Sequence, residues 1–294
     1  NAVLFTGTAD LASTGTLDVE ASTGSITQST TSVFSSASDI RLLAAQDVTI
    51  GLVTTLANVS ITAIAGSIID ADALVNNAND TNLDIVATGL RANAGVGIGA
   101  NINHLDTAVG TLTARATGVA TTGGIYVKET DGLIVGDVSV TIQRVGSDAA
   151  TTSTTDAVQS DVRTVAGNGN IVLTAGGSIV LNDGTATADD VAIDANGSGN
   201  VLVLALGGDL IANADIVSGN GAVSVLAAGA LSLTGSADLR TAGSIDIEAA
   251  AIAQSVASVI FSTSDVRLLA ATTVTVGAIS TTGNVSITAL TGSI

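Results

Sequence analysis

The 294-residue chain contains no cysteine, proline, methionine or tryptophan, and only one tyrosine and three phenylalanines. Without cysteine, neither a disulfide framework nor a thiolate metal site is available. Because large aromatic side chains are scarce, the interior must be built from Ala, Val, Ile and Leu. Proline would remove a hydrogen bond from a strand that is paired on both sides, so its absence favours continuous β-sheet.

Basic residues are also few, with 8 Lys and Arg against 26 Asp and Glu, a formal net charge of −18 and a pI near 4.1. Nucleic acids and anionic membranes require a basic surface, so we expect no nucleic-acid partner. Charged residues make up only 12% of the chain and the mean hydropathy is +0.59, which is the opposite of a disordered composition. Apolar runs such as Val201 to Leu206 are far shorter than the ~18 residues of a spanning helix, so we expect no membrane insertion.

A long internal repeat is present. Residues 32–68 match residues 258–294 without a gap at an offset of 226, with about 23 of 37 positions identical. With a two-residue slip the match extends upstream, so that residues 6–68 match residues 234–294. We therefore expect residues 1–294 to form one continuous domain that holds a unit of about 226 residues and the start of the next. The polypeptide is expected to continue at both ends.

A shorter module, apolar-x-apolar-x-Ala, recurs at intervals of about 19 to 33 residues, for example at Leu17 to Ala21, Val59 to Ala63 and Val285 to Ala289. Strict alternation predicts half-buried strands with one face toward a core. Gly and Asn clusters between the modules predict turns. Short strands at this period predict an all-β parallel solenoid with about 20–30 residues per coil. An array of immunoglobulin-like sandwiches is the rival, but such domains normally hold a core aromatic residue.

Residues 66–145 resemble the repeat region of filamentous-haemagglutinin-type exoproteins and the giant bacterial surface proteins related to them. The matching segments are Gly66 to Ile69, Leu83 to Ala87, Gly97 to Gly99, Leu105 to Leu112 and Gly123 to Val127. The resemblance implies a right-handed parallel β-helix and a secreted fibre or adhesin. It carries over no receptor-binding loop and no cell-attachment motif.

Two acidic clusters are candidate metal sites. Their members are Asp70, Asp72, Asp80 and Asp84 in the first, and Asp183, Asp189, Asp190 and Asp194 in the second. Calcium prefers six to eight oxygen ligands, which carboxylates and asparagine side chains at loop corners would supply. No calcium-binding nonapeptide repeat or EF-hand loop is present. Solvated acidic corners that keep the protein soluble are the alternative.

No catalytic or cofactor-binding constellation is apparent. His104 is the only histidine and is expected in a loop or at the surface. Asp39 with Arg41, and Asp265 with Arg267, are expected to form weak surface ion pairs within one strand face.

These patterns favour a non-enzymatic structural segment of a giant extracellular bacterial fibre or surface filament. Its expected partner is itself, through end-to-end continuation or lateral association. The alternative is the stalk of a secreted adhesin whose binding element lies elsewhere or on a loop such as Val145 to Thr164. Calcium is the one cofactor the sequence leaves open.

Overall fold

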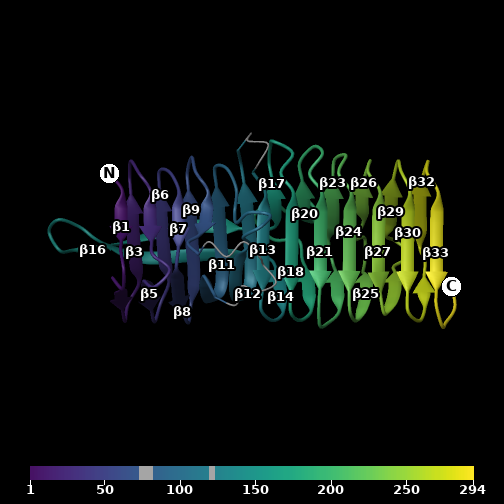
Figure 1. Ribbon diagram of the computed structural model, residues 1–294, viewed down its shortest axis with the longest axis horizontal. Helices are drawn as coiled ribbons and strands as arrows, with labels where there is room; N and C mark the ends of the chain where they lie inside the picture. The colour runs from purple at the N-terminus through teal and green to yellow at the C-terminus, as the bar shows by residue number, and fades with distance from the viewer. Residues whose placement is uncertain (73–81, 119–122) are drawn as a thin grey trace.

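The computed structural model describes residues 1–72, 82–118 and 123–294, which form a single rod of stacked β-coils (Figure 1). Strands pair in parallel from coil to coil, and about 12 turns lie one above another. No helix occurs among the described residues, so none that is long and apolar enough to cross a membrane was found there. The predicted all-β parallel solenoid is therefore confirmed.

Three stacks of strands build the N-terminal half, and β11 and β12 each run around a corner from the first stack to the second. The first stack contains β2 (Leu11–Ser13), β5 (Val33–Ser36), β8 (Leu52–Thr55) and the beginnings of β11 (Ile85–Ala94) and β12 (Leu105–Ala116). The second contains β3 (Leu17–Ala21), β6 (Ile40–Ala44), β9 (Asn58–Ala63) and the remainders of β11 and β12. The third contains β1 (Val3–Phe5), β4 (Ile26–Gln28), β7 (Val48–Ile50) and β10 (Ile68–Asp70).

Three further stacks build the C-terminal half. The fourth contains β13 (Ile125–Glu129), β18 (Ile171–Ala175), β21 (Val201–Ala205), β24 (Val223–Ala227), β27 (Ile245–Ala249), β30 (Val266–Ala270) and β33 (Val285–Ala289). The fifth contains β14 (Leu133–Val135), β19 (Ile179–Leu181), β22 (Leu210–Ala212), β25 (Ala230–Leu233), β28 (Ala251–Gln254) and β31 (Val274–Thr275). The sixth contains β17 (Val162–Thr164), β20 (Val191–Ala195), β23 (Asp215–Ser218), β26 (Leu239–Thr241), β29 (Val259–Ser262) and β32 (Ala278–Thr281).

The core lies inside the coils and is aliphatic, as the composition predicts. In β9, Val59, Ile61 and Ala63 are fully buried and stack on Ile40, Leu42 and Ala44 of β6 in parallel register. Thr62 points outward and is only half-buried. Ser60 also belongs to the outward set by alternation, yet it is fully buried because a hairpin covers it.

A buried glutamine links neighbouring coils in both copies of the long repeat. The Gln28 amide donates to the carbonyl oxygens of Ser32 and Leu52 and accepts from the Gly51 N–H. Gln254 makes the same three hydrogen bonds to Ser258, Ala278 and Gly277, which lie 226 residues further on. The two copies therefore share side-chain contacts as well as sequence.

The stacks do not run straight through the rod. At the end of β12, Thr111 and Leu112 pair with β14, whereas Ala114 to Ala116 pair with β17. The second stack thus divides into the fifth and the sixth. On the other side of the rod, β13 pairs with β12 of the first stack. β13 also continues the third stack, because Ile98 bridges to Ile68 of β10 and to Ile125 of β13. The first and third stacks thus merge into the fourth.

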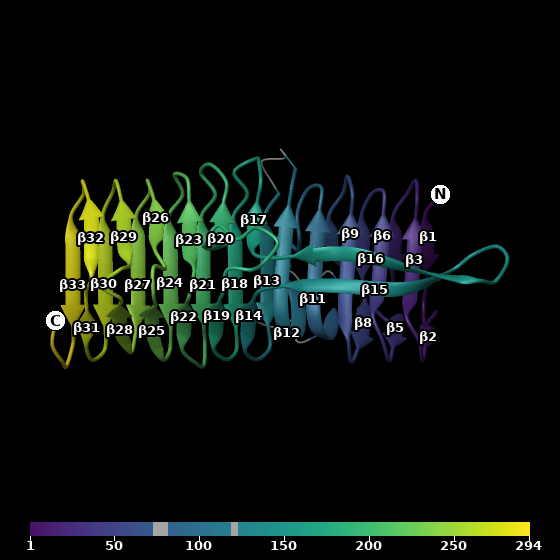
Figure 2. The ribbon, with the colours of Figure 1, turned by 180° about the vertical axis from the view of Figure 1, so that it is seen from behind.

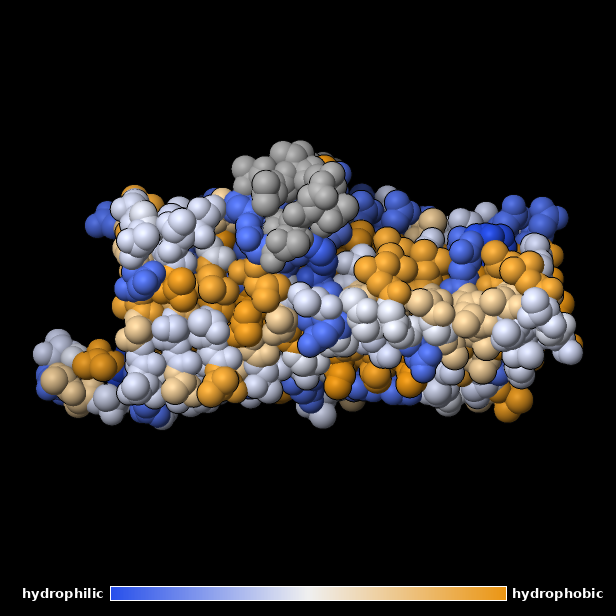
Figure 3. Space-filling view, turned by 60° about the horizontal axis from the view of Figure 1, so that its bottom comes forward, coloured by the Kyte–Doolittle hydropathy of each residue, from blue (hydrophilic) through white to orange (hydrophobic). Residues whose placement is uncertain are grey.

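One excursion leaves the solenoid between β14 and β17. It is an antiparallel hairpin of β15 (Val138–Val145) and β16 (Thr151–Gln159), and it runs back along the outside of the second stack (Figure 2). Val138, Val140 and Ile142 are buried on its inner side. Its tip extends beyond the N-terminal end of the rod, as the hydropathy-coloured surface also shows at the lower left of Figure 3. The segment Val145 to Thr164, expected as a loop, therefore consists mostly of a docked strand.

Candidate functional site

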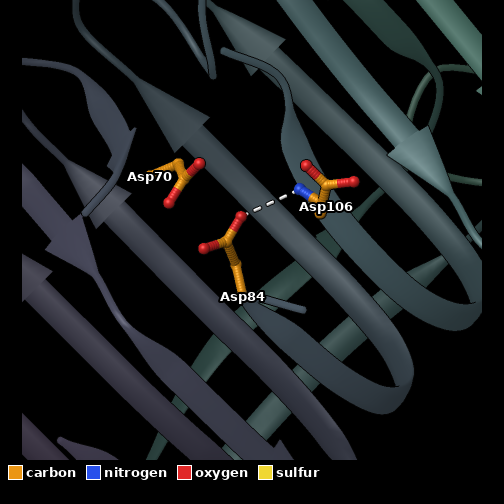
Figure 4. A group of neighbouring side chains, drawn as sticks. All are labelled: Asp70, Asp84 and Asp106. Atoms are coloured by element: carbon orange, nitrogen blue, oxygen red, sulfur yellow. Dashed lines mark hydrogen bonds between the residues drawn. The ribbon is translucent and has the colours of Figure 1, made fainter. Parts of the chain in front are cut away.

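Three buried aspartates converge at one side of the N-terminal half (Figure 4). Asp70 ends β10, Asp84 immediately precedes β11, and Asp106 is the second residue of β12. One carboxylate oxygen from each lies within 4.8 Å of the others, and this is the one group of potential metal ligands found among the described residues. The structure thus brings Asp70 and Asp84 together, as the sequence predicts, and adds Asp106, which the sequence analysis missed.

The stacking of coils explains this cluster. Ile85 pairs with Thr107 and Asp106 pairs with Lys128, so Asp84, Asp106 and Lys128 occupy the same position in three successive coils. Stacked coils lie ~4.8 Å apart, which places like charges in direct opposition. The Asp106 N–H donates to the Asp84 carboxylate at 2.8 Å, and the Lys128 ammonium lies 2.7 Å from Asp106 Oδ1. The lysine therefore offsets part of the acidic charge.

Protonation of Asp84 removes another part of the negative charge of the cluster. Burial, followed by the negative charge of Asp70, raises the pKa of Asp84 to about 10. Asp84 is therefore protonated at neutral pH. Asp70 and the half-buried Asp72 line a groove of about 580 Å³ beside the cluster together with Asn82. Asp80, the fourth member expected, lies outside the described residues.

We expect Asp84→Asn to stabilise the protein at neutral pH. A folded pKa near 10 against 3.8 means that the contribution of Asp84 is most favourable below pH 4 and is lost progressively as the pH rises toward 10. An amide keeps the acceptor for the Asp106 N–H without that loss, so the free energy of unfolding should rise by roughly 2–4 kcal/mol at pH 7.

Denaturant unfolding of both proteins between pH 4 and 9 measures this effect. The gain should shrink toward pH 4, and Asp148→Asn in the exposed hairpin turn is the control for replacing one carboxylate by an amide. The quantity compared is the free energy of unfolding of Asp84→Asn minus that of the parent protein. If this difference is smaller at pH 7 than at pH 4, Asp84 is not a buried neutral carboxyl group.

Calcium binding by this cluster remains a prediction of the sequence, with solvated acidic corners as its alternative. Only one oxygen from each of the three carboxylates is brought within 4.8 Å of the others, against the six to eight oxygen ligands calcium prefers, and the Lys128 ammonium already contacts Asp106. We therefore expect the same melting temperature in millimolar calcium chloride and in sodium chloride of equal ionic strength. A calcium-specific rise that is absent in Asp106→Asn would establish the site instead.

The second acidic cluster is arranged around an arginine. Arg163 binds Asp189 and Asp194, each at 2.9 Å. The Asp183 carboxylate accepts a hydrogen bond from the Asp190 N–H at 3.1 Å, and Asp190 also accepts from Ser236 at 2.7 Å. In the described residues these four carboxylates do not form one group of potential ligands.

His104 lies in a loop, as expected, but it is buried and not at the surface. Its ring lies 5.8 Å from the ring of Tyr126. Burial, with the nearby Lys128 charge, lowers the pKa of His104 to about 4, so it is neutral at physiological pH. The ring packs within the wall of the solenoid and carries no charge there.

A network of charged side chains fastens the hairpin to the second stack. Arg41 donates to Asp18 at 2.9 Å and to Asp156 of the hairpin at 3.1 Å, and its side chain is only 8% exposed. Asp156 also accepts from Ser60 at 2.6 Å. Arg144 of the hairpin donates to Asp18 at 2.9 Å and binds Glu20. Charges of both signs therefore alternate across the interface.

The predicted ion pair between Asp39 and Arg41 does not form. Asp39 precedes β6, and its carboxylate accepts from the backbone N–H groups of Asn58 and Thr141 instead. Arg41 finds its partners on the adjacent coil and on the hairpin, because side chains in register on stacked strands are closer than residues two apart on one strand. The corresponding Arg267 likewise pairs with Asp246 and Glu248, not with Asp265.

Polar side chains also bind the backbone edge of β15. Asn58 donates to the Ser139 carbonyl oxygen at 3.1 Å, Asp39 accepts from the Thr141 N–H at 2.8 Å, and Thr16 accepts from the Gln143 N–H at 2.8 Å. The three side chains come from three successive coils. They take the place of a neighbouring strand and satisfy an otherwise open edge.

Comparison with known proteins adds no relative. No family model matches the chain, and neither the curated proteins nor the solved structures contain a match. The strand register of the described residues therefore defines the class of protein, a parallel β-solenoid with a docked external hairpin.

Proposed function

We propose that this protein is a structural segment of a giant extracellular bacterial fibre or surface filament, with no enzymatic activity. The observation that carries the proposal is the direct stacking of the second repeat copy on the first unit. β27, β30 and β33 continue the coil ladder from β24 without a linker and keep the register found in β3, β6 and β9. A unit that stacks on its own copy supports an array of indefinite length.

The dimensions of the unit follow from the ladder. Nine successive pairings lead from β2 to β27 through β5, β8, β11, β12, β13, β18, β21 and β24. β27 directly follows β26, the repeat counterpart of β2, so one unit spans slightly fewer than nine coils; at ~4.8 Å for each pairing it adds at most roughly 43 Å to the rod. Among the described residues, β1 pairs with β4 and β33 pairs with β30, and in the proposed array each would pair with a further coil on its other side.

The alternative is the stalk of a secreted adhesin whose binding element lies elsewhere. The hairpin tip favours it, because residues 146–150 project from the rod as a short turn closed by the hydrogen bond from the Gly146 N–H to the Ala150 carbonyl oxygen. The proposed partner is the protein itself in the first case and a surface ligand in the second.

Electron microscopy of native material, with mass-per-length measurement, tests the proposal. Long uniform fibres with an axial repeat near 43 Å, or a simple multiple of it, are expected. Short stalks ending in a globular knob would favour the adhesin. Turnover of an acidic glycan by the purified chain would contradict both, since each is non-enzymatic.

A further inference from the structure

The side chains that hold the hairpin on β3, β6 and β9 recur on β27, β30 and β33. The charged set Asp18, Glu20 and Arg41 corresponds to Asp246, Glu248 and Arg267. In both copies these residues lie at matching positions of stacked strands, since Asp18 pairs with Arg41 and Asp246 pairs with Arg267. The charge pattern that meets the hairpin is thus present twice.

The polar groups that bind the hairpin backbone recur as well. Counterparts of Thr16, Asp39, Asn58 and Ser60 are Ser244, Asp265, Asn284 and Ser286, in that order. Three of the four are identical, and the replacement of Thr16 by serine keeps a hydroxyl acceptor. These seven hairpin-binding positions on β3, β6, β9 and the residues just before them therefore keep their chemistry in the second copy.

The second copy differs in being uncovered. The Arg267 side chain is 46% exposed against 8% for Arg41, and Asp246 is 36% exposed against 13% for Asp18. Arg267 lies on β30, which has a neighbouring strand on each side, so its exposure does not come from the open edge of the last coil. A shallow groove of about 330 Å³ is lined by Asp246, Asp265, Arg267, Asn284 and Ser286, all of them among these positions.

In the second copy, the residues at the hairpin-binding positions bind one another. Arg267 directs its guanidinium to both Asp246 and Glu248, the two carboxylates whose counterparts are bound by Arg144 in the first copy. The Asn284 amide donates back to Asp265 at 3.2 Å, whereas its counterpart Asn58 donates to the hairpin. Arg267 and Asn284 therefore bind neighbours within the second copy, where their counterparts Arg41 and Asn58 also bind the hairpin.

We propose that the outer surface of β27, β30 and β33 is the docking site of a second β-hairpin with the chemistry of β15–β16. That hairpin carries an arginine to bind Asp246 and Glu248 and an aspartate to bind Arg267 and Ser286. The continuation of the second unit supplies it, so the inference rests on the proposed tandem array for the source of the hairpin. Docking then fastens the hairpin of each unit to the first coils of that same unit.

The test is a longer chain in which residues 69–164 are appended after Ile294, the counterpart of Ile68, so that a second hairpin is present. Thermolysin cleavage is followed separately in the two hairpins by mass spectrometry. Arg267→Glu should accelerate cleavage of the second hairpin at least tenfold and leave the first unchanged. Arg41→Glu is the matched control and should do the reverse.

Cleavage of the second hairpin that is unaffected by Arg267→Glu, while Arg41→Glu releases the first, would overturn the proposal. If hydrogen exchange shows that the appended coils are unfolded, a second variant joins residues 136–161 to Ile294 through a flexible Gly/Ser linker. In that variant a cysteine placed by Asp246→Cys should react with a thiol reagent at least tenfold more slowly than in the 294-residue chain. Equal labelling rates in the two would also overturn the proposal.

This experiment is separate from the imaging of native fibres. If the second hairpin is protected but native material forms no fibres, the docking site is supported and the fibre proposal is contradicted. If uniform fibres form but the second hairpin is unprotected, the fibre proposal is supported and the docking site is contradicted.

Discussion

Ile61→Asp should destabilise the protein by roughly 4 kcal/mol, because it places a charge without a partner inside the coil. Ile61 is fully buried between Leu42 and Ala92 of the neighbouring coils. Denaturant unfolding followed by circular dichroism measures the loss. The neighbouring outward residue provides the control, since Thr62→Asp places the same charge on the half-buried outer face and should cost less than about 1 kcal/mol. Equal losses in the two variants would contradict the register of β9.

Arg41→Ala should cost roughly 3 kcal/mol and release the hairpin. The Arg41 guanidinium is almost fully buried between Asp18 and Asp156, so its removal leaves two carboxylates without their shared partner. Thermolysin cleavage within β15 and β16 should accelerate in parallel with the loss of stability, because Arg41 is the most buried of the charged groups that join the hairpin to the second stack.

Arg267→Ala is the matched variant for this prediction. It removes the same side chain from the same position of the repeat, but the Arg267 ion pairs are largely exposed and the site has no hairpin on it. Exposed ion pairs contribute little to stability, so the 294-residue chain should tolerate the change. If the two variants lose similar amounts of free energy of unfolding, the hairpin contacts of Arg41 contribute nothing to stability.

The fold was predictable because its signals are local and repeated. Alternation within Val59 to Ala63 predicts which side chains face the core, and the spacing of such modules predicts coils of about 20–30 residues. In the structure, successive members of the column Val53, Ile85, Thr107 and Glu129 are 22 to 32 residues apart. The next step, from Glu129 to Ala175, is longer because it contains the hairpin.

The candidate site was less accessible to sequence reasoning, which grouped acidic residues by their closeness along the chain. In a solenoid the neighbours of a side chain lie one coil away. Asp84, Asp106 and Lys128 are each 22 residues apart, and that interval, applied to charged residues, identifies the ladder. Asp70 joins it from the end of another strand, a proximity that only the path of the chain around the coil determines.

The hairpin was missed for a different reason. Residues 151–159 are mostly threonine and other exposed residues, with no alternating apolar face of their own, and β16 owes its strand structure to pairing with β15. Docking depends on Asp18, Arg41 and Ser60, which lie about 100 residues earlier in the chain. Contacts at such separation leave no local sequence signal.

The division of one stack and the merging of two others at β12 and β13 has a consequence for symmetry. The second stack leads to the corner between the fifth and sixth, whereas the strands that repeat its sequence belong to the fourth stack, on the opposite wall of the rod. Translation along the axis therefore does not superimpose one unit on the next without a rotation of about half a turn. An array with this twofold screw would carry its hairpins on alternate sides. Its true axial period would be two units, roughly 86 Å at ~4.8 Å for each coil.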